Sequence, residues 1–429
     1  MTSLFTVFLS IFLISCSPTA KPQDSNTITI WHWMSDREGA FKELARIYEE
    51  EKGIKVNFEL YAPSEVYTQK IRAAAQTNTL PDIFGILGKK RDLASFIKAG
   101  HIYNLTEDMK ANNSEWENRL FNKALSVNEF KSENSFDIEP GIYGIPLDVT
   151  NLQMLYNKDL LRRVGWPEDS PPETWEEFIE ASRLLNENNI QGFISGWGEI
   201  WMIDCFASNY AFNIMGEKKV LDTIKGKVPY TDPDWIKVFG LFRQMRDEKM
   251  LAKGVVTMVN KTAEQLFANS KACFAFNGSW CVNVYSGMNP DLNYGAMLPP
   301  KVLDKNPMVI WGGAGSSFMV NNRVSGPRKA VDFLRWLTDT PQQSYLAAAT
   351  RNLPSNKESL KDIPDILFQF ADDMDNTTHP NVWGVSEFPE VIETFNKGIQ
   401  SIIIGEKTPE GLAGEVQAVK MREMEKAGQ

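Results

Sequence analysis

Strand-like and helix-like segments alternate along most of the chain, and this order constrains the fold more than any other feature of the sequence. Residues 28–33 (ITIWHW) are typical of a strand, residues 39–52 place apolar side chains at helical spacing, and residues 54–60 alternate as a second strand. Gly53 ends the predicted helix. A strand, helix, strand order predicts a parallel crossover, so we expect an α/β protein with ligand sites beyond the carboxyl ends of its strands.

The same alternation continues further along the chain. Residues 67–76 predict a helix and residues 81–86 the next buried strand. The polar stretch 112–140 predicts a helix followed by a surface loop. Thr174 and Glu177 have the spacing of a capping box, which predicts a helix that begins there and has a structural role.

The amino terminus has the pattern of an export signal. Residues 4–14 are almost wholly apolar, but they are too few to span a bilayer, which needs about 20 residues. The run ends within the tetrapeptide LISC (residues 13–16), which resembles a bacterial lipobox with Cys16 as the lipidated residue. No Lys or Arg precedes the apolar run, and a plain hydrophobic tail is the alternative. We predict a signal peptide over 1–15, a tether over 16–27, and an exported protein that is lipid-anchored at the cell membrane surface.

Composition excludes several classes of function. The chain has 45 basic and 55 acidic residues, a net charge of −10, which argues against a nucleic-acid binder. Its three histidines and four cysteines show no metal-ligand spacing, so no structural zinc site and no cofactor are expected. Cys273 and Cys281 flank a predicted turn and could pair, but burial of Cys205, Cys273 and Cys281 as small apolar residues is favoured.

Several segments, in a fixed order behind the lipobox, carry a family resemblance. They are ITIWHW, LPDIFGI, YGIPLDVTNLQMLYNKDLL, PPETWEEF, FNGSW, NYGAMLPP with WGGAGSSFMVNN, AVDFLRWLTDTPQQSYLAAATRNLPS and IIIGEKTPEGLAGEV. Together they resemble family 1 extracellular solute-binding proteins, the sugar-binding components of bacterial ABC importers, related to maltodextrin-binding proteins. The resemblance covers residues 28–425.

The resemblance implies a two-lobed periplasmic-binding-protein fold of type II-like form, with a hinge between the lobes. Each lobe is expected to have a central sheet flanked by helices. The implied lobe boundaries are 28–146 plus 308–358 and 147–307 plus 359–429. The crossings are expected near 145–150, 298–310 and 355–370. The implied partners are a carbohydrate ligand, the permease subunits of an ABC importer and the membrane, and the protein is expected to be a monomer.

Aromatic residues suit the apolar C–H face of a sugar ring, and planar polar side chains suit its hydroxyls. The resemblance places a stacking aromatic at Trp280, in FNGSW. It places ligand contacts in the loop that contains Trp197 and Trp201. For each of the three tryptophans, a plain core position is the alternative.

Other candidates follow strands on both sides of the predicted cleft. Trp33 and Asp36 follow the first strand, where related proteins contact sugar hydroxyls. Gly312 and Gly313 permit close approach of a ligand and are expected to line the cleft. Trp311, just before them, is either a lining or a core residue.

Four further polar residues divide between the site and the scaffold. Asp148 and Asn151 lie in the predicted hinge crossing, and the resemblance makes them hydroxyl partners. Asp82 at a strand start is interpreted as structural, and Asp159 as a helix cap.

Two basic features depart from the pattern of a neutral-sugar binder. Lys89, in the run Lys89 to Arg91, occupies a rim loop, and Arg351 occupies a second loop that approaches the site in relatives. They suggest an anionic oligosaccharide such as a uronide. The alternative, favoured for Lys90 and Arg91, is a solvated surface run.

An enzyme is the alternative from a different class. The chain has no nucleophile elbow, P-loop, GxGxxG fingerprint or HExxH. An exported polysaccharide-degrading enzyme stays the alternative, because it needs only two carboxylates and the chain has 55 acidic residues. A binding lipoprotein that serves a sensor is a third interpretation. We predict a binding protein without catalysis.

Overall fold

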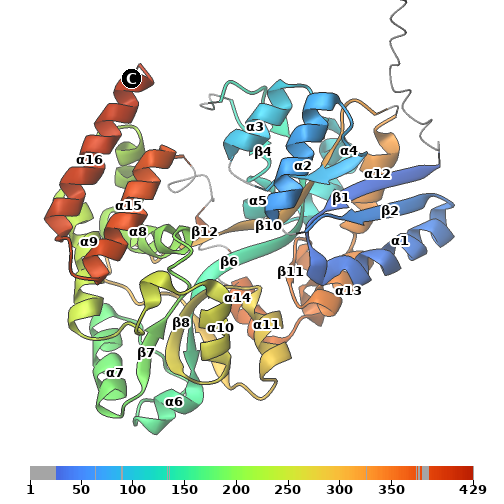
Figure 1. The fold of residues 1–429 in the computed structure, drawn as a ribbon. Helices are drawn as coiled ribbons and strands as arrows, with labels where there is room; N and C mark the ends of the chain where they lie inside the picture. The colour runs from blue at the N-terminus through green and yellow to red at the C-terminus, as the bar shows by residue number, and fades with distance from the viewer. Residues whose placement is uncertain are drawn as a thin grey trace, which may run out of the picture.

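The computed structural model describes residues 26–428, except residues 63, 88–89, 133, 135, 325, 373, 375–376 and 379–385. The predicted signal peptide, Cys16 and Lys89 therefore lie outside the described residues. The described chain forms two α/β lobes joined by crossing strands (Figure 1). The predicted α/β class and two-lobed architecture are confirmed.

The first lobe begins with the predicted parallel crossover. β1 (Thr27–His32) pairs in parallel with β2 (Lys55–Leu60) and with β3 (Ile83–Gly85). The helix α1 (Glu38–Lys52) joins β1 to β2 and ends at Gly53, whose φ of 66° is left-handed. The other elements of this lobe are α2 (Ser64–Thr77), α3 (Lys90–Lys98), α4 (Thr106–Arg119), α5 (Asn122–Leu125), β4 (Glu129–Phe130), β5 (Gly141–Ile142), α12 (Arg328–Leu337) and α13 (Thr340–Thr350).

One long strand belongs to both lobes. β6 (Ile145–Asn157) has all 13 residues buried. Its first half pairs with β10 (Ile310–Val320), which also pairs with β3, and its second half pairs with β8 (Ala272–Gly278) and β9 (Tyr294–Met297). The resulting sheet has the order β2-β1-β3-β10-β6-β8-β7 and runs through the whole molecule. Two short strands lie beside it, namely β11 (Leu353–Pro354) and β12 (Thr377–Thr378).

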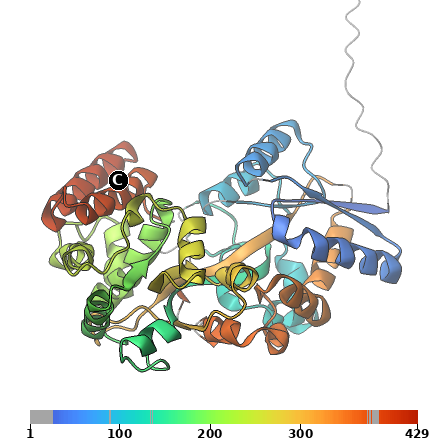
Figure 2. The same cartoon turned by 60° about the horizontal axis from the view of Figure 1, so that its bottom comes forward.

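Helices enclose the second lobe. They are α6 (Lys158–Arg163), α7 (Trp175–Glu187), α8 (Trp201–Ile224), α9 (Pro233–Asp247), α10 (Asn260–Ala268), α11 (Cys281–Met288), α14 (Asp365–Asp372), α15 (Pro389–Ile403) and α16 (Pro409–Lys426), around β8 and β7 (Gln191–Ile194). The predicted capping box is confirmed at the start of α7, where Thr174 Oγ1 accepts from the Glu177 amide at 3.2 Å. Figure 2 shows α15 and α16 at the outer edge of this lobe, opposite the first lobe.

Three other structural interpretations can be compared with the structure. The backbone amide of Thr29 donates to Asp82 Oδ2 at 2.8 Å, so Asp82 is structural as predicted. Asp159 is not the cap of α6, because Asn157 Oδ1 accepts from the Leu160 amide at 3.0 Å and Asp159 is the second residue of the helix, within its first turn. Cys205, Cys273 and Cys281 are free and buried, as favoured.

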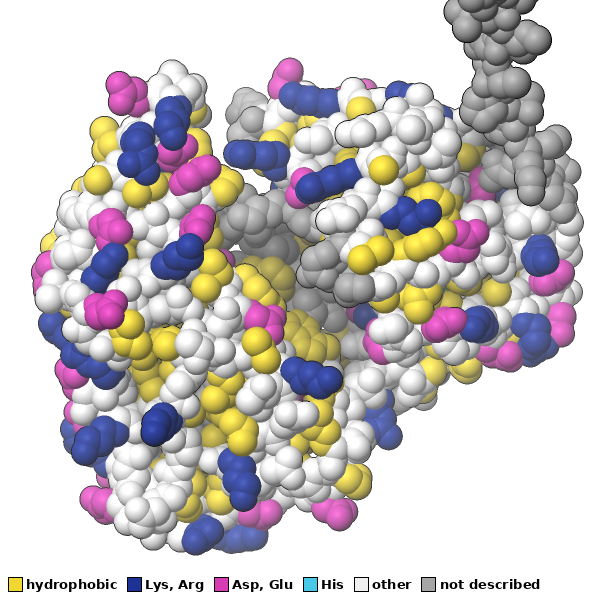
Figure 3. Space-filling view, in the orientation of Figure 1, with side chains coloured by type: hydrophobic (Ala, Val, Ile, Leu, Met, Phe, Trp, Pro, Cys, Tyr) yellow, Lys and Arg dark blue, Asp and Glu magenta, His cyan; other side chains and the backbone are white. Residues whose placement is uncertain are grey.

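Charged side chains of both signs are interspersed over the surface in Figure 3. No helix within the described part of the chain is long and apolar enough to cross a membrane. The boundaries predicted for the two lobes stay a prediction.

His32 is a titratable group inside the first-lobe core. It is fully buried, and its ring meets the rings of Phe41 and Phe58 edge-on at 5.1 and 5.9 Å. Burial lowers the pKa of His32 to about 4. The unfolded chain would therefore bind a proton below the ordinary pKa of about 6.5, while the folded chain resists protonation until about pH 4.

We predict that His32→Leu flattens the acid sensitivity of the fold. Between pH 6.5 and pH 4, the free energy of unfolding of the wild type should fall by up to about 3 kcal/mol more than that of the variant. The reason is that the unfolded chain binds a proton at His32 over this pH range and the folded chain does not. Urea unfolding at a series of pH values measures this difference. Leu334→Ala is the control, since it removes packing in the same core without removing a ring that covers His32, and it should shift stability equally at every pH. Parallel pH profiles of wild type and His32→Leu would contradict the prediction.

Candidate functional site

A cavity of about 480 Å³ lies where the two lobes meet. A hollow separates the lobes in the space-filling view (Figure 3). The lining comes from the loop after β1, from the crossing strands β6 and β10, and from the starts of α8 and α11. Its residues are Trp33, Met34, Ser35, Asp36, Arg37, Asp148, Val149, Thr150, Trp201, Trp280, Asn283, Val284, Trp311, Ala314, Gly315, Ser316 and Asn352. Its size is in the range of small-molecule sites.

The first-lobe wall is formed by Trp33. The ring of Trp33 lies 5.1 Å from that of Tyr67 at 46°, and it covers the backbone of Gly85 at the end of β3. A Cβ at Gly85 would lie 2.3 Å from Trp33 Cζ3. Glycine at this position therefore lets the indole pack directly on the backbone at the strand end.

The second-lobe wall is formed by two tryptophans. Trp280 lies over Gly278, the last residue of β8, where a Cβ would come within 2.0 Å of Trp280 Cζ3. Trp201, 41% exposed, lies with its ring 6.2 Å from that of Trp280 at 46°. The pair presents an aromatic surface at the start of α8 and α11.

The floor of the cavity is a buried polar network. The Arg37 guanidinium pairs with Asp148 on β6, and its Nη1 donates to Ser316 Oγ on β10 at 3.0 Å. Asp148 Oδ1 accepts from both the amide and the hydroxyl of Ser316 at 2.6 Å. Gly315 leaves room for this carboxylate, since a Cβ there would lie 3.1 Å from both its oxygens. The network ties the loop after β1 to both crossing strands.

Asp36 is the exposed member of this network. Its carboxylate is 47% exposed and lies 3.6 Å from Arg37 Nε. Burial alone would lower the pKa of Arg37, but Asp148 and Asp36 outweigh burial and raise it. Arg37 therefore stays charged, while Asp36 keeps oxygens toward the cavity that can accept hydrogen bonds from a ligand.

The structure brings together some of the predicted site residues. Trp33, Asp36, Asp148, Trp201 and Trp280 all line the cavity, although they come from four separate parts of the sequence. Their contact with a ligand stays a prediction.

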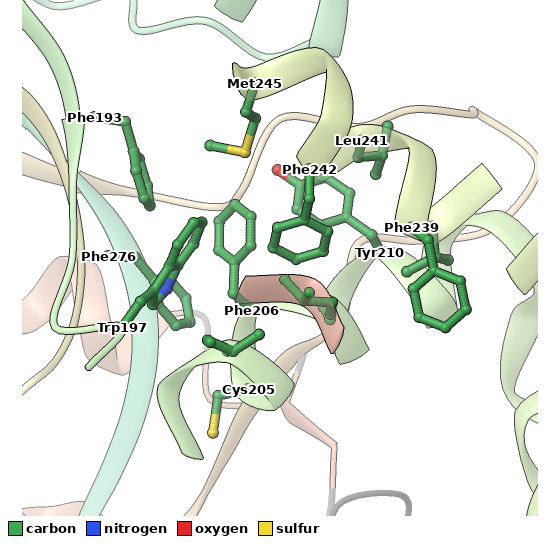
Figure 4. Packing of buried hydrophobic residues seen from close by; sticks show 14 of the residues in the cluster. Phe193, Trp197, Cys205, Phe206, Tyr210, Phe239, Leu241, Phe242, Met245 and Phe276 are labelled. Atoms are coloured by element: carbon green, nitrogen blue, oxygen red, sulfur yellow. The ribbon is translucent and has the colours of Figure 1, made fainter. Parts of the chain in front are cut away.

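Other predicted residues lie elsewhere. Trp197 is fully buried among Phe193, Phe206 and Phe242 in the second-lobe core (Figure 4). Asn151 is fully buried, and its Nδ2 donates to the Phe370 carbonyl at 2.7 Å.

The predicted glycines and Arg351 also lie outside the lining. Gly312 and Gly313 sit within β10, paired with β6, while Trp311 and Gly315 on the same strand reach the cavity. Arg351 is exposed at the end of α13 with a left-handed φ of 49°. Contact of these three residues with a ligand stays a prediction, and the loop of Arg351 reaches the cavity through Asn352.

Of the basic run, the structure describes Lys90 and Arg91, and only Arg91 is exposed. Lys90 is half-buried, and its Nζ donates to the carbonyls of Ser126 and Val127 at 3.2 and 2.7 Å and to that of Glu129. Burial lowers the pKa of Lys90 to about 8. Lys90 therefore anchors a loop, whereas Arg91 is exposed as expected.

Sequence reasoning missed several lining residues. Arg37 is next to Asp36 and Asn352 is next to Arg351, so proximity to a candidate was the available signal. Asn283 and Val284 follow Trp280 by about one helical turn, and only the orientation of α11 brings them to the cavity.

The chemistry of the cavity suits binding by stacking and hydrogen bonding. Within the described residues, no group of three or more His, Cys, Asp or Glu side chains could hold a metal ion. The lining offers aromatic faces on both lobes and polar groups between them.

A two-lobed architecture with a cavity at the crossing strands defines a class of binding protein. The chain belongs to the bacterial extracellular solute-binding protein family, which matches residues 43–374. The resemblance seen in the sequence is thereby confirmed.

Known proteins of this class align along most of the chain. It is 25% identical over 379 residues to the melibiose/raffinose/stachyose-binding protein of Bacillus subtilis, covering 84% of this chain and 82% of that protein. It is 21% identical over 414 residues to the galactooligosaccharide-binding protein of the same organism, covering 94% and 91%. A solved chitin oligosaccharide binding protein shares the fold with a TM-score of 0.76 at 20% identity, over 93% of this chain and 99% of that one.

We predict that Arg37→Ala destabilises the protein by about 3 kcal/mol or more, because Asp148 would keep a buried charge without its partner. Arg46→Ala is the matched control, since Arg46 pairs with exposed acids on α1 and its loss should change stability far less. Chemical unfolding measures both. Equal, small effects of the two substitutions would show that the buried pair does not support the fold.

Proposed function

We propose that this protein captures a neutral oligosaccharide between its lobes and delivers it to an ABC importer. The observation that carries the proposal is the presence of tryptophans on opposite walls of one cavity, Trp33 on one lobe and Trp201 with Trp280 on the other. Such walls suit the apolar faces of sugar rings, while Asp36 and Asn352 suit the hydroxyls between them. We propose the lobe boundaries given by the sequence.

The charge of the cavity favours a neutral ligand over an anionic one. Among the described lining residues there are two carboxylates, Asp36 and Asp148, and one cation, Arg37. Arg37 is already occupied by Asp148 and Ser316. Arg351, on which the uronide hypothesis partly rested, is outside the lining.

The relatives of this chain agree with this ligand class. They include binding proteins for melibiose, raffinose and stachyose, for galactooligosaccharides and for maltodextrin, and a solved neighbour holds raffinose. Galactose-containing oligosaccharides are therefore our first candidates.

The proposal excludes hydrolysis of the ligand. A glycoside hydrolase needs two carboxylates free to act on one bond. Asp148 is held by Arg37 and by both donors of Ser316, which leaves Asp36 as the available carboxylate among the described lining residues. The family likewise consists of binding proteins.

Calorimetric titration with melibiose, raffinose, stachyose, maltotriose, chitotriose and a digalacturonide tests the proposal. We expect stoichiometric binding of at least one neutral saccharide, with no products after prolonged incubation. Binding of the digalacturonide alone would overturn the neutral ligand class, and turnover would overturn the binding function.

We predict that Trp280→Ala weakens binding of that saccharide by about 2 kcal/mol or more, because a buried aromatic contact is lost, with little change in Tm. Trp166→Ala is the control. Trp166 is a half-buried tryptophan of the same lobe that is outside the lining, so its loss should leave affinity unchanged. Unfolding of Trp280→Ala with normal residual affinity would assign Trp280 to the core.

We also propose that Cys16 is lipidated after removal of residues 1–15, which would hold the exported protein at the membrane as a monomer. The apolar run before LISC supports this. We expect Cys16→Ala to move the protein from the membrane fraction to the soluble exported fraction. An unchanged membrane fraction would contradict lipidation at Cys16.

A further inference from the structure

A buried carboxylate lies behind the tryptophan wall of the second lobe. Glu264, on α10, is only 6% exposed. No ion pair to it is found within the described residues. Because burial of an unpaired carboxylate is costly, its hydrogen-bond partners must account for its presence.

These partners connect Glu264 to the backbone on which Trp280 packs. Glu264 Oε1 accepts from Asn277 Nδ2 at 3.0 Å, and Asn277 Oδ1 in turn accepts from the Gly278 amide at 2.8 Å. The Trp280 indole rests on Gly278. The Trp280 side chain also lowers the pKa of Glu264, so it lies near the carboxylate. The backbone under the indole is thus held by a chain of hydrogen bonds that ends at Glu264.

A second branch leads to the loop before Trp201. Glu264 Oε1 also accepts from Asn260 Nδ2 at 2.9 Å. The Asn260 backbone amide donates to Glu199 Oε1 at 2.8 Å, two residues before Trp201. The loop packs closely here, because a Cβ at Gly196 would lie 2.5 Å from Asn260 Cα. One carboxylate therefore joins the supports of both tryptophans.

We infer that Glu264 is a positioning residue that holds Trp201 and Trp280 together as one aromatic platform, through Asn260 and Asn277. Its use for sugar stacking rests on the proposed function. Its effect on the two rings does not, since the hydrogen bonds exist without a ligand. Glutamine in its place keeps a carbonyl oxygen for the two N–H donors but removes the negative charge, so both hydrogen bonds at Oε1 weaken.

The surroundings of Glu264 also make the platform sensitive to pH. Burial raises the pKa of the Glu264 carboxyl, and the negative charge of Glu199 raises it further. The hydrogen bonds that Glu264 accepts lower this pKa, but they do not cancel the effect of burial. The titratable groups that face Glu264 are Glu199, Cys281 and Tyr285. A protonated carboxyl loses acceptor capacity, so the platform should loosen as pH falls through this raised pKa.

Fluorine NMR of the protein labelled with 5-fluorotryptophan tests the inference without a ligand. The Trp201 and Trp280 resonances are assigned with the Trp→Phe variants. Glu264→Gln should shift or broaden these two resonances and leave that of Trp175, in the core of the same lobe, unchanged. The wild-type resonances should titrate at acidic pH, and those of Glu264→Gln should not.

The matched control is Glu187→Gln, the same chemical change at an exposed position of the same lobe. It should leave every resonance in place. If Glu264→Gln does not fold, Asn260→Ala removes one link at a half-buried position and should move the Trp201 resonance. Unchanged Trp201 and Trp280 resonances in a folded Glu264→Gln or Asn260→Ala variant would overturn the inference.

Binding provides the second readout. For whichever saccharide of the panel binds the wild type, Glu264→Gln should weaken binding about tenfold, as expected when charge-assisted hydrogen bonds become neutral ones, and should flatten the acidic limb of the affinity profile. Equal affinity and an unchanged pH profile would overturn the positioning role. Failure of every saccharide to bind the wild type would instead overturn the proposed function and leave the NMR result to decide the role of Glu264.

Discussion

Both lobes depend on the backbone pairing of β6. Every buried amide and carbonyl of a strand needs a partner, and this strand finds its partners in β10 on one side of the crossing and in β8 and β9 on the other. The Arg37–Asp148 pair then holds the loop after β1 against the same strand. The cavity lies at the crossing because β6, its partner β10 and the loop after β1 meet there and form part of its lining.

The aromatic walls are built in the same way on the two lobes. Trp33 lies over Gly85, and Trp280 lies over Gly278, each glycine being the last residue of a strand. Because glycine has no Cβ, an indole can pack directly on the backbone at these two strand ends. Both walls of the cavity therefore include a tryptophan that packs on main chain.

Three carboxylates near the cavity have different roles because their surroundings differ. Asp148 is buried against Arg37 and Ser316, and Glu264 is buried against asparagine side chains behind Trp280. Both hold structure. Asp36 remains half-exposed and keeps oxygens directed toward the cavity. A carboxylate in a sugar site is thus a ligand-binding group or a support according to the donors that already surround it.

Local patterns in the sequence determined the elements of the fold. Apolar periodicity placed β1, α1 and β2, and the spacing of Thr174 and Glu177 placed the start of α7, because these features depend on residues close in the chain. The segments that carry the family resemblance predicted the two-lobed fold and five of the residues that line the cavity. The direction of each side chain was decided only by tertiary structure. Trp197 and Trp201 stand four residues apart in one loop, yet the first packs among phenylalanines and the second reaches the cavity, since the packing of α8 against β7 and α9 decides which indole is inside. Arg37 is held by Asp148, 111 residues away, and Glu264 accepts a hydrogen bond from Asn277 on β8, so no pattern within a single element encodes either position.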